Sequence, residues 1–167
     1  MKAKTYKTIL IAAALAIMPA HTVYATERKA IMQDDPVPLD VRIACEVWGN
    51  QYNICPELLE AIAYHESRFV SDAENGTCKG VMQINVTCHK ERAQALDVQD
   101  INNVEENIML AADYLHELFE EYEDVGVVLA LYHGEKDGQA KAERGELSPY
   151  VRNILAKSAE LERLHGY

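Results

Sequence analysis

Residues 56–69, PELLEAIAYHESRF, decide which fold this chain adopts. The proline stands at a favoured helix start, because the first helical position needs no amide hydrogen. Apolar side chains then recur at helical spacing at Leu58, Leu59, Ile62 and Ala63. Glu66 continues this stripe, four residues after Ile62 and seven after Leu59. The pattern therefore predicts a helix with a carboxyl group on its buried face.

Glu66 is the residue of this helix whose chemistry needs an explanation, because glutamate is rarely buried without a partner. Burial raises the pKa of a carboxyl group, and the negative end of the helix dipole acts in the same direction. A glutamic acid that stays protonated near neutral pH can act as a general acid on a leaving oxygen. The same pattern also fits an ordinary helix-end glutamate that reaches solvent or pairs with Arg68. The stripe alone leaves both interpretations open.

Most of the remaining chain is also predicted to be helical. A first helix starts near Asp40, which we expect to cap it, and another starts at Asn103 with Glu106 as its capping-box partner. The apolar run 125–132 fits a buried helix or a strand, and the surrounding helices favour a helix. Pro149 begins the last helix, whose inward residues are predicted to be Val151, Ile154, Leu155, Leu161 and Leu164.

Residues 71–88 interrupt this helical pattern, because they are rich in Asn, Gly, Ser and Thr. They predict an irregular segment with a short hairpin, and residues 136–147 predict a polar loop. The fold class is therefore mainly α, a single domain with an irregular or short β insertion around residues 71–88.

The N-terminal residues have the organisation of a secretory signal peptide. Three lysines precede the apolar run 9–19, and Val23-Tyr24-Ala25, a small-x-small-like cleavage signature, follows it. The apolar run is too short to span a bilayer comfortably, so we expect export without a stable membrane anchor. This interpretation divides the chain into a signal peptide at residues 1–25, a polar linker at 26–39 and one domain at 40–167.

The charge of the exported part excludes several classes of partner. Residues 1–25 carry three of the 16 basic residues and none of the 27 acidic ones, which leaves a formal charge of −14. Such a chain is repelled by nucleic acid and by anionic membranes. We therefore expect neither as a partner.

Four cysteines, Cys45, Cys55, Cys78 and Cys88, remain in the exported part. An even count in an exported chain indicates disulfides, and four cysteines allow three pairings. We expect the sequence-local pairs, Cys45 with Cys55 and Cys78 with Cys88. A metal site built from Cys78, Cys88 and His89 matches no zinc spacing. No metal or cofactor is expected.

Five short motifs follow one another along the chain. They are His65-Glu66-Ser67-Arg68-Phe69, Gly80-Val81-Met82-Gln83-Ile84, Asn107-Ile108 with Tyr114-Leu115, Ala130-Leu131-Tyr132-His133-Gly134, and Tyr150-Val151-Arg152-Asn153-Ile154-Leu155. In this order and spacing they resemble the motifs of the soluble lytic transglycosylase (SLT-type) family. The resemblance covers residues 54–156 and implies a lysozyme-like, mainly helical fold.

The resemblance implies that Glu66 is the single catalytic acid and base of a peptidoglycan-cleaving enzyme. In this family one glutamic acid protonates the bond between N-acetylmuramic acid (MurNAc) and N-acetylglucosamine (GlcNAc). The muramyl C6 hydroxyl then attacks its own anomeric carbon and leaves a 1,6-anhydro end. An intramolecular nucleophile removes the need for a second carboxylate that positions water.

The resemblance also implies which residues contact the glycan strand, namely Ser67, Asn75, Met82, Gln83, Tyr132 and Tyr150. Several of them have a structural alternative: Ser67 bonding local backbone, Gln83 fixing its loop, Met82 in the core and Tyr150 packing the last helix. Asn107 is expected to fix its helix to the active-site loop. Two departures from the family pattern concern substrate contacts: Asn75-Gly76-Thr77-Cys78 replaces a Ser-x-x-Gly-Ala segment, and His133 replaces an asparagine.

Two other functions remain open. A hydrolase of lysozyme type on the same fold would use Glu66 to activate water, with Asp72 or Glu74 as a second acid. An inactive wall-binding component of a secretion or conjugation apparatus is the other. A small exported enzyme also suits local wall opening for a wall-spanning secretion or conjugation machine. The expected location is the cell envelope, either the periplasm or the extracellular wall.

Overall fold

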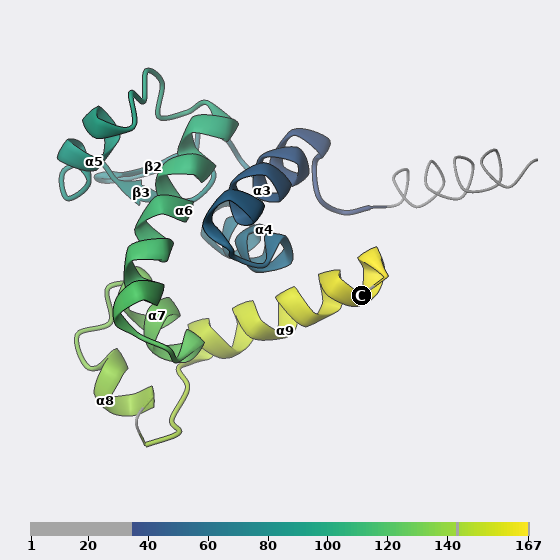
Figure 1. Cartoon of the computed structure of the whole chain (residues 1–167), viewed down its shortest axis with the longest axis vertical. Coiled ribbons are helices and arrows are strands. Elements are labelled where there is room, and N and C mark those ends of the chain that lie inside the picture. The colour runs from purple at the N-terminus through teal and green to yellow at the C-terminus, as the bar shows by residue number, and fades with distance from the viewer. Residues whose placement is uncertain (1–34, 143, 167) are drawn as a thin grey trace, which may run out of the picture. The chain divides into compact units, whose positions relative to one another are not determined.

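The computed structural model describes residues 35–142 and 144–166, and a compact unit begins at Val37 (Figure 1). The predicted signal peptide and most of the predicted linker lie outside these residues. The described helices are α3 Leu39–Tyr52, α4 Pro56–Ser67, α5 Lys90–Ala95, α6 Val104–Glu121, α7 Val125–Tyr132, α8 Gly138–Ala142 and α9 Pro149–His165. No helix in this part of the chain is long and apolar enough to cross a membrane.

The predicted insertion contains a small antiparallel sheet. Its strands, in the order β1-β2-β3, are β1 Glu74–Asn75, β2 Cys78–Lys79 and β3 Ile84–Asn85. Asn75 pairs with Cys78 across the first turn, and Cys78 pairs with Asn85 across the second. The prediction of a short hairpin is confirmed and extended by one strand. The mainly helical fold class is confirmed as well, and the predicted loop at 136–147 contains the short α8.

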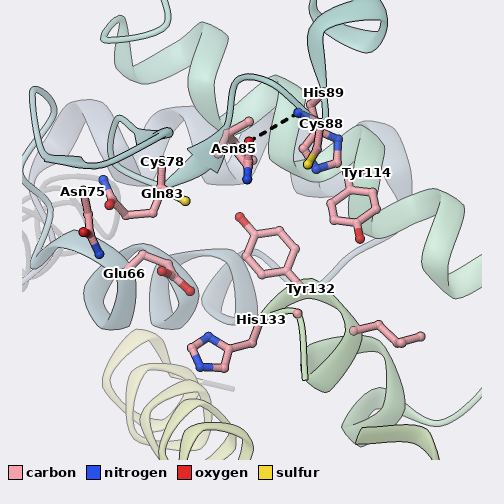
Figure 2. Close-up of a pocket in the computed structure, with 13 residues that line it drawn as sticks. Glu66, Asn75, Cys78, Gln83, Asn85, Cys88, His89, Tyr114, Tyr132 and His133 are labelled. Atoms are coloured by element: carbon pink, nitrogen blue, oxygen red, sulfur yellow. Dashed lines mark hydrogen bonds between the residues drawn. The ribbon is translucent and has the colours of Figure 1, made fainter. Parts of the chain in front are cut away.

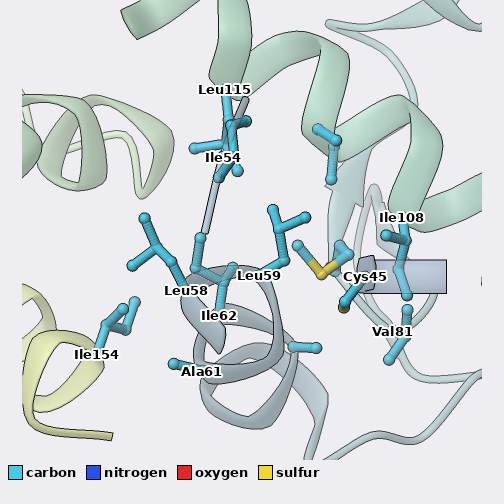
Figure 3. Packing of buried hydrophobic residues seen from close by; sticks show 14 of the residues in the cluster. Cys45, Ile54, Leu58, Leu59, Ala61, Ile62, Val81, Ile108, Leu115 and Ile154 are labelled. Atoms are coloured by element: carbon cyan, nitrogen blue, oxygen red, sulfur yellow. The ribbon is translucent and has the colours of Figure 1, made fainter. Parts of the chain in front are cut away.

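Helix α4 lies at the centre of the hydrophobic core (Figure 3). Its side chains from Leu58 to Ala63 are all buried, so this helix has no solvent-exposed face over that stretch. Helices α3 and α9 pack against it. In Figure 3, Leu59 and Ile62 of α4 lie among side chains of other elements, including Ile154 of α9 and Leu115 of α6. The core therefore fixes the position of α4 from several sides.

Two local predictions at helix starts are wrong. Pro38, not Asp40, is the N-cap of α3, and Asp40 lies in the first turn. Asn103 caps α6 by accepting from the Glu106 amide, but the Glu106 carboxylate accepts from Gln99 and Asp100 and does not close a capping box.

The inward face of the last turn of α9 also differs from the prediction. Leu164 is 42% exposed, whereas Leu161 is fully buried. Four residues after Leu161, the inward position belongs to His165, whose Nδ1 lies 2.9 Å from Glu57 Oε1. One helical turn separates Leu161 from His165, so both lie on the same face of α9.

The predicted disulfides are not formed, because all four cysteines are free. Cys45 is buried in the core on α3, and the Cys55 thiol instead donates to Glu57 Oε2 at 3.2 Å. Cys78 and Cys88 both line a pocket as separate thiols. Short sequence spacing brought these cysteines into the same regions but did not set the direction of their side chains. Among the described residues, no group of three or more His, Cys, Asp or Glu side chains is arranged to hold a metal.

Asn107 joins α6 to the loop that follows β2. Its side chain is fully buried, accepts from the Met82 amide at 2.8 Å and donates to the carbonyl oxygens of Lys79 and Ile101. Gly80 makes this contact possible, since a Cβ there would lie 2.3 Å from Asn107 Nδ2. Gly80 also has φ +78°, a left-handed conformation that favours glycine. The predicted role of Asn107 in fixing this loop is in keeping with these contacts.

We expect Asn107→Ala to lower the free energy of unfolding by about 3 kcal/mol, because it removes the three buried hydrogen bonds between the Asn107 side chain and the backbone. Urea denaturation followed by circular dichroism measures the change. Asn102→Ala is the matched control, because Asn102 is exposed in the segment just before α6 and its replacement should change stability by less than about 0.5 kcal/mol. Equal stability of the two variants would contradict the structural role of Asn107.

Candidate active site

Glu66 lies in the last turn of α4, and its carboxyl group faces a pocket (Figure 2). The helix ends immediately afterwards, because Arg68 adopts a left-handed conformation with φ 56°. The Arg68 guanidinium turns back over the Tyr64 ring and donates to the Tyr64 carbonyl oxygen. Arg68 is therefore engaged with Tyr64, and the alternative of a surface pair between Glu66 and Arg68 is not realised.

Tyr150 supplies the hydrogen bond to the Glu66 carboxyl group. Its hydroxyl donates to Glu66 Oε1 at 2.6 Å, from the first turn of α9. Burial raises the pKa of Tyr150, and the nearby Glu66 charge adds to this effect. The phenol therefore remains a hydrogen-bond donor throughout the neutral pH range.

The environment of Glu66 favours the protonated form of its carboxyl group, compared with a carboxyl group in water. Burial raises the pKa of Glu66 above its ordinary value. The hydrogen bond from Tyr150 and the positive charge of His133 act in the opposite direction, but they do not outweigh burial. This arrangement gives a carboxylic acid that can donate a proton and whose anion then has a hydrogen-bond partner.

The pocket has a volume of about 380 Å³ and lies between the end of α4, the small sheet and the end of α7. Figure 2 shows Glu66, Tyr132 and His133 directed into the same opening, with His89 and Tyr114 at another end. Among the described residues that line this pocket, Glu66 is the only acid. The remaining polar groups are mostly amides, imidazoles and phenols, which suit an uncharged polar ligand such as a sugar.

Three of the predicted contact residues line the pocket with Glu66, namely Asn75, Gln83 and Tyr132. Gln83 also fixes its own loop, because its amide nitrogen donates to the carbonyl oxygens of Ala73 and Gly80. The Tyr132 hydroxyl donates to the Met82 carbonyl oxygen at 2.9 Å. Gln83 and Tyr132 therefore line the pocket and also form hydrogen bonds that hold the backbone of its wall.

The other three predicted contact residues lie behind the pocket wall. The Ser67 hydroxyl lies 2.8 Å from the Val81 carbonyl oxygen, to which it donates, and so ties the end of α4 to the facing loop. The Met82 side chain is fully buried in the core. Tyr150 reaches the site through its hydrogen bond to Glu66. Ser67 and Met82 therefore have structural roles, a bond to local backbone and a place in the core, which were the alternatives to contact with the glycan.

The pocket residues without a predicted contact role include three with polar rings, namely His89, Tyr114 and His133. Tyr114 belongs to one of the five motifs, so a signal for it was present in the sequence. His133 was visible as a departure from the family pattern. His89, whose ring packs 4.3 Å from that of Tyr114, carried no signal.

The family model described as Transglycosylase SLT domain matches residues 44–150, more than half of the chain. The match includes every residue of the pocket described above. It confirms the predicted family and agrees with the mainly helical, lysozyme-like fold. No curated protein matches the chain.

We expect Tyr150→Phe to raise the pKa of Glu66, because the lost hydrogen bond stabilises the carboxylate. Glu66 should then stay protonated to a higher pH than in the wild type. Carbon-13 NMR of the Glu66 carboxyl group, titrated in both proteins, measures the change. Tyr122→Phe, which alters a tyrosine outside the pocket, should leave that titration unchanged. A Glu66 pKa that is equal or lower in Tyr150→Phe would contradict this reading of the hydrogen bond.

Proposed function

Because this chain belongs to the transglycosylase SLT domain family, we propose that it is a peptidoglycan lytic transglycosylase. It cleaves the MurNAc-β-1,4-GlcNAc bond of glycan strands and leaves 1,6-anhydro-MurNAc ends. The observation that carries this proposal is a single, partly buried carboxyl group with a raised pKa in a pocket whose described lining contains no other acid. One carboxyl group suffices where the substrate supplies its own nucleophile.

In the proposed reaction Glu66 serves first as an acid and then as a base. Its proton passes to the glycosidic oxygen while the bond from that oxygen to the muramyl anomeric carbon breaks. The Glu66 carboxylate then takes the proton of the muramyl C6 hydroxyl, whose oxygen bonds to the anomeric carbon. The Tyr150 hydroxyl stabilises the carboxylate between the two proton transfers.

The positions of the other candidate acids favour this mechanism over hydrolysis. Asp72 and Glu74 were considered as second carboxylates, and both are exposed outside the described pocket lining. Glu74 forms an ion pair with Lys79 at 3.2 Å. Hydrolases with two carboxylates place both of them around the scissile bond. The pocket has no such pair among its described residues.

The proposal includes a place of action and a use. Peptidoglycan as the substrate implies the cell envelope, which the chain would reach through the signal peptide at residues 1–25. Local opening of the wall for a secretion or conjugation machine remains the proposed use. The strong negative charge means that binding to the wall relies on the shape and hydrogen bonds of the pocket, because anionic polymers repel the chain.

We expect Glu66→Gln to lower the rate of release of soluble fragments from purified sacculi by about 10³-fold, the typical contribution of general acid–base catalysis. The amide keeps the size of the side chain but has no transferable proton. Turbidity loss gives the rate, and mass spectrometry identifies the ends as anhydro products, one water lighter than hydrolysed ones. Wild-type activity no greater than that of Glu66→Gln would instead support an inactive wall-binding protein.

Asp72→Asn and Glu74→Gln test the hydrolase alternative in the same assay. We expect both variants to keep wild-type rates within about twofold, because neither side chain belongs to the described pocket lining. Reducing muramic ends as the sole product, together with a large loss of activity in either variant, would establish a lysozyme-type reaction and refute ours.

A further inference from the structure

The His133 side chain connects the end of α7 to α9 and, through Tyr150 of α9, to Glu66 of α4. It follows the last turn of α7, and its amide donates to the Leu129 carbonyl oxygen. Its imidazole ring stacks on the Tyr150 ring of α9, with centroids 3.8 Å apart and planes inclined by 15°. The Tyr150 hydroxyl in turn donates to Glu66 of α4. The two contacts therefore form a continuous path from His133 through Tyr150 to Glu66.

The stacked ring limits the ways in which Tyr150 can move. A phenol that is held face to face by a second ring keeps its plane, and its hydroxyl then keeps its direction. The ring of His65 contacts Tyr150 edge-on from α4, with centroids 6.0 Å apart. Two imidazoles from different helices thus surround the phenol that bonds to the proposed acid.

The charge of His133 also reaches Glu66 directly. Both side chains line the same pocket, and Figure 2 shows them at one side of it. A positive charge on His133 favours the Glu66 carboxylate and lowers the pKa of that group. The other titratable groups facing this position are His65 on α4, Tyr150 on α9, Tyr132 on α7 and Glu135 in the loop after α7.

We propose that His133 is a positioning residue that holds the Tyr150 hydroxyl on Glu66 through ring stacking. The positive charge of His133, which lines the same pocket, also lowers the pKa of Glu66. This inference rests on the proposed function, because it concerns a residue that acts on Glu66, the proposed catalytic acid. The asparagine expected here from the family resemblance can neither stack as a ring nor carry a proton charge. This chain therefore has an aromatic ring stacked on Tyr150 where the family pattern has an amide.

Two variants separate the two effects. His133→Phe keeps a ring of similar width but carries no charge, whereas His133→Asn removes both the ring and the charge. His116→Asn is the matched control, because His116 lies on α6 against Tyr52 and outside the pocket lining. Thermal unfolding of all variants checks that each one is folded.

The first readout is the titration of the Glu66 carboxyl group by carbon-13 NMR, with the signal assigned through Glu66→Gln. We expect His133→Phe and His133→Asn to raise the pKa of Glu66, because each removes a positive charge from its surroundings. His116→Asn should leave it unchanged. A Glu66 titration that is identical in the wild type and both His133 variants overturns the proposed effect of the charge.

The second readout is the rate of fragment release from sacculi as a function of pH. An acid-dependent rate falls as the pH rises through the pKa of the acid, so the alkaline limb should move to higher pH in both His133 variants. On the acid side of that limb, the rate of His133→Phe should exceed that of His133→Asn by roughly tenfold, about the value of one hydrogen bond to a charged group. Equal acid-side rates in the two variants overturn the proposed role of stacking.

The two readouts also separate this inference from the proposed function. If the wild type releases no fragments, the proposed transglycosylase activity fails, and the NMR titration still decides whether His133 tunes Glu66. If the wild type is active and Glu66→Gln is not, unchanged pH profiles in the His133 variants refute this inference alone.

Discussion

The burial of α4 from Glu57 to Ala63 is the constraint on which the remaining architecture depends. A helix that is surrounded on all sides must have neighbours in every direction, and α3 and α9 supply two of them. The burial extends to Glu57, whose carboxylate needs partners because an isolated buried charge is costly. Burial raises the pKa of Glu57, but hydrogen bonds with His165 and Cys55 outweigh it, and the pKa is lowered. The two ends of the C-terminal helix α9 therefore contact different carboxyl groups of α4. His165 contacts Glu57, and Tyr150 donates to Glu66.

The loop that faces Glu66 is fixed by side chains from three different helices. Ser67 of α4 donates to the Val81 carbonyl oxygen, Asn107 of α6 accepts from the Met82 amide, and Tyr132 of α7 donates to the Met82 carbonyl oxygen. Each bond reaches backbone atoms of the loop, so its position does not depend on which apolar side chains it carries. A site held in this way is preorganised, because little has to be ordered when a substrate arrives.

The helices and the proposed acid could be predicted from the sequence because both are local patterns. The stripe in residues 56–69 gave α4 and placed Glu66 on its buried face, and the ordered motifs connected that helix with the loop and with α7. The bond between Tyr150 and Glu66 could not be predicted from periodicity, since 84 residues separate the partners. Side-chain direction was the other limit. Leu164 and His165 are adjacent in the sequence, but the apolar side chain is largely exposed and the polar one contacts Glu57 of α4.

The bonds that hold the pocket wall also set the hydrogen-bond polarity that a ligand meets there. The one hydrogen of the Tyr132 hydroxyl is engaged by the Met82 carbonyl oxygen, which leaves only lone pairs on that oxygen. Both hydrogens of the Gln83 amide are engaged in the same way by Ala73 and Gly80, so its remaining atom is a carbonyl oxygen. At these two places the wall can accept hydrogen bonds but cannot donate them. A ligand is therefore selected for hydroxyl and acetamido N–H groups at these points, and an analogue with ether oxygens there would leave the acceptors of the wall unsatisfied.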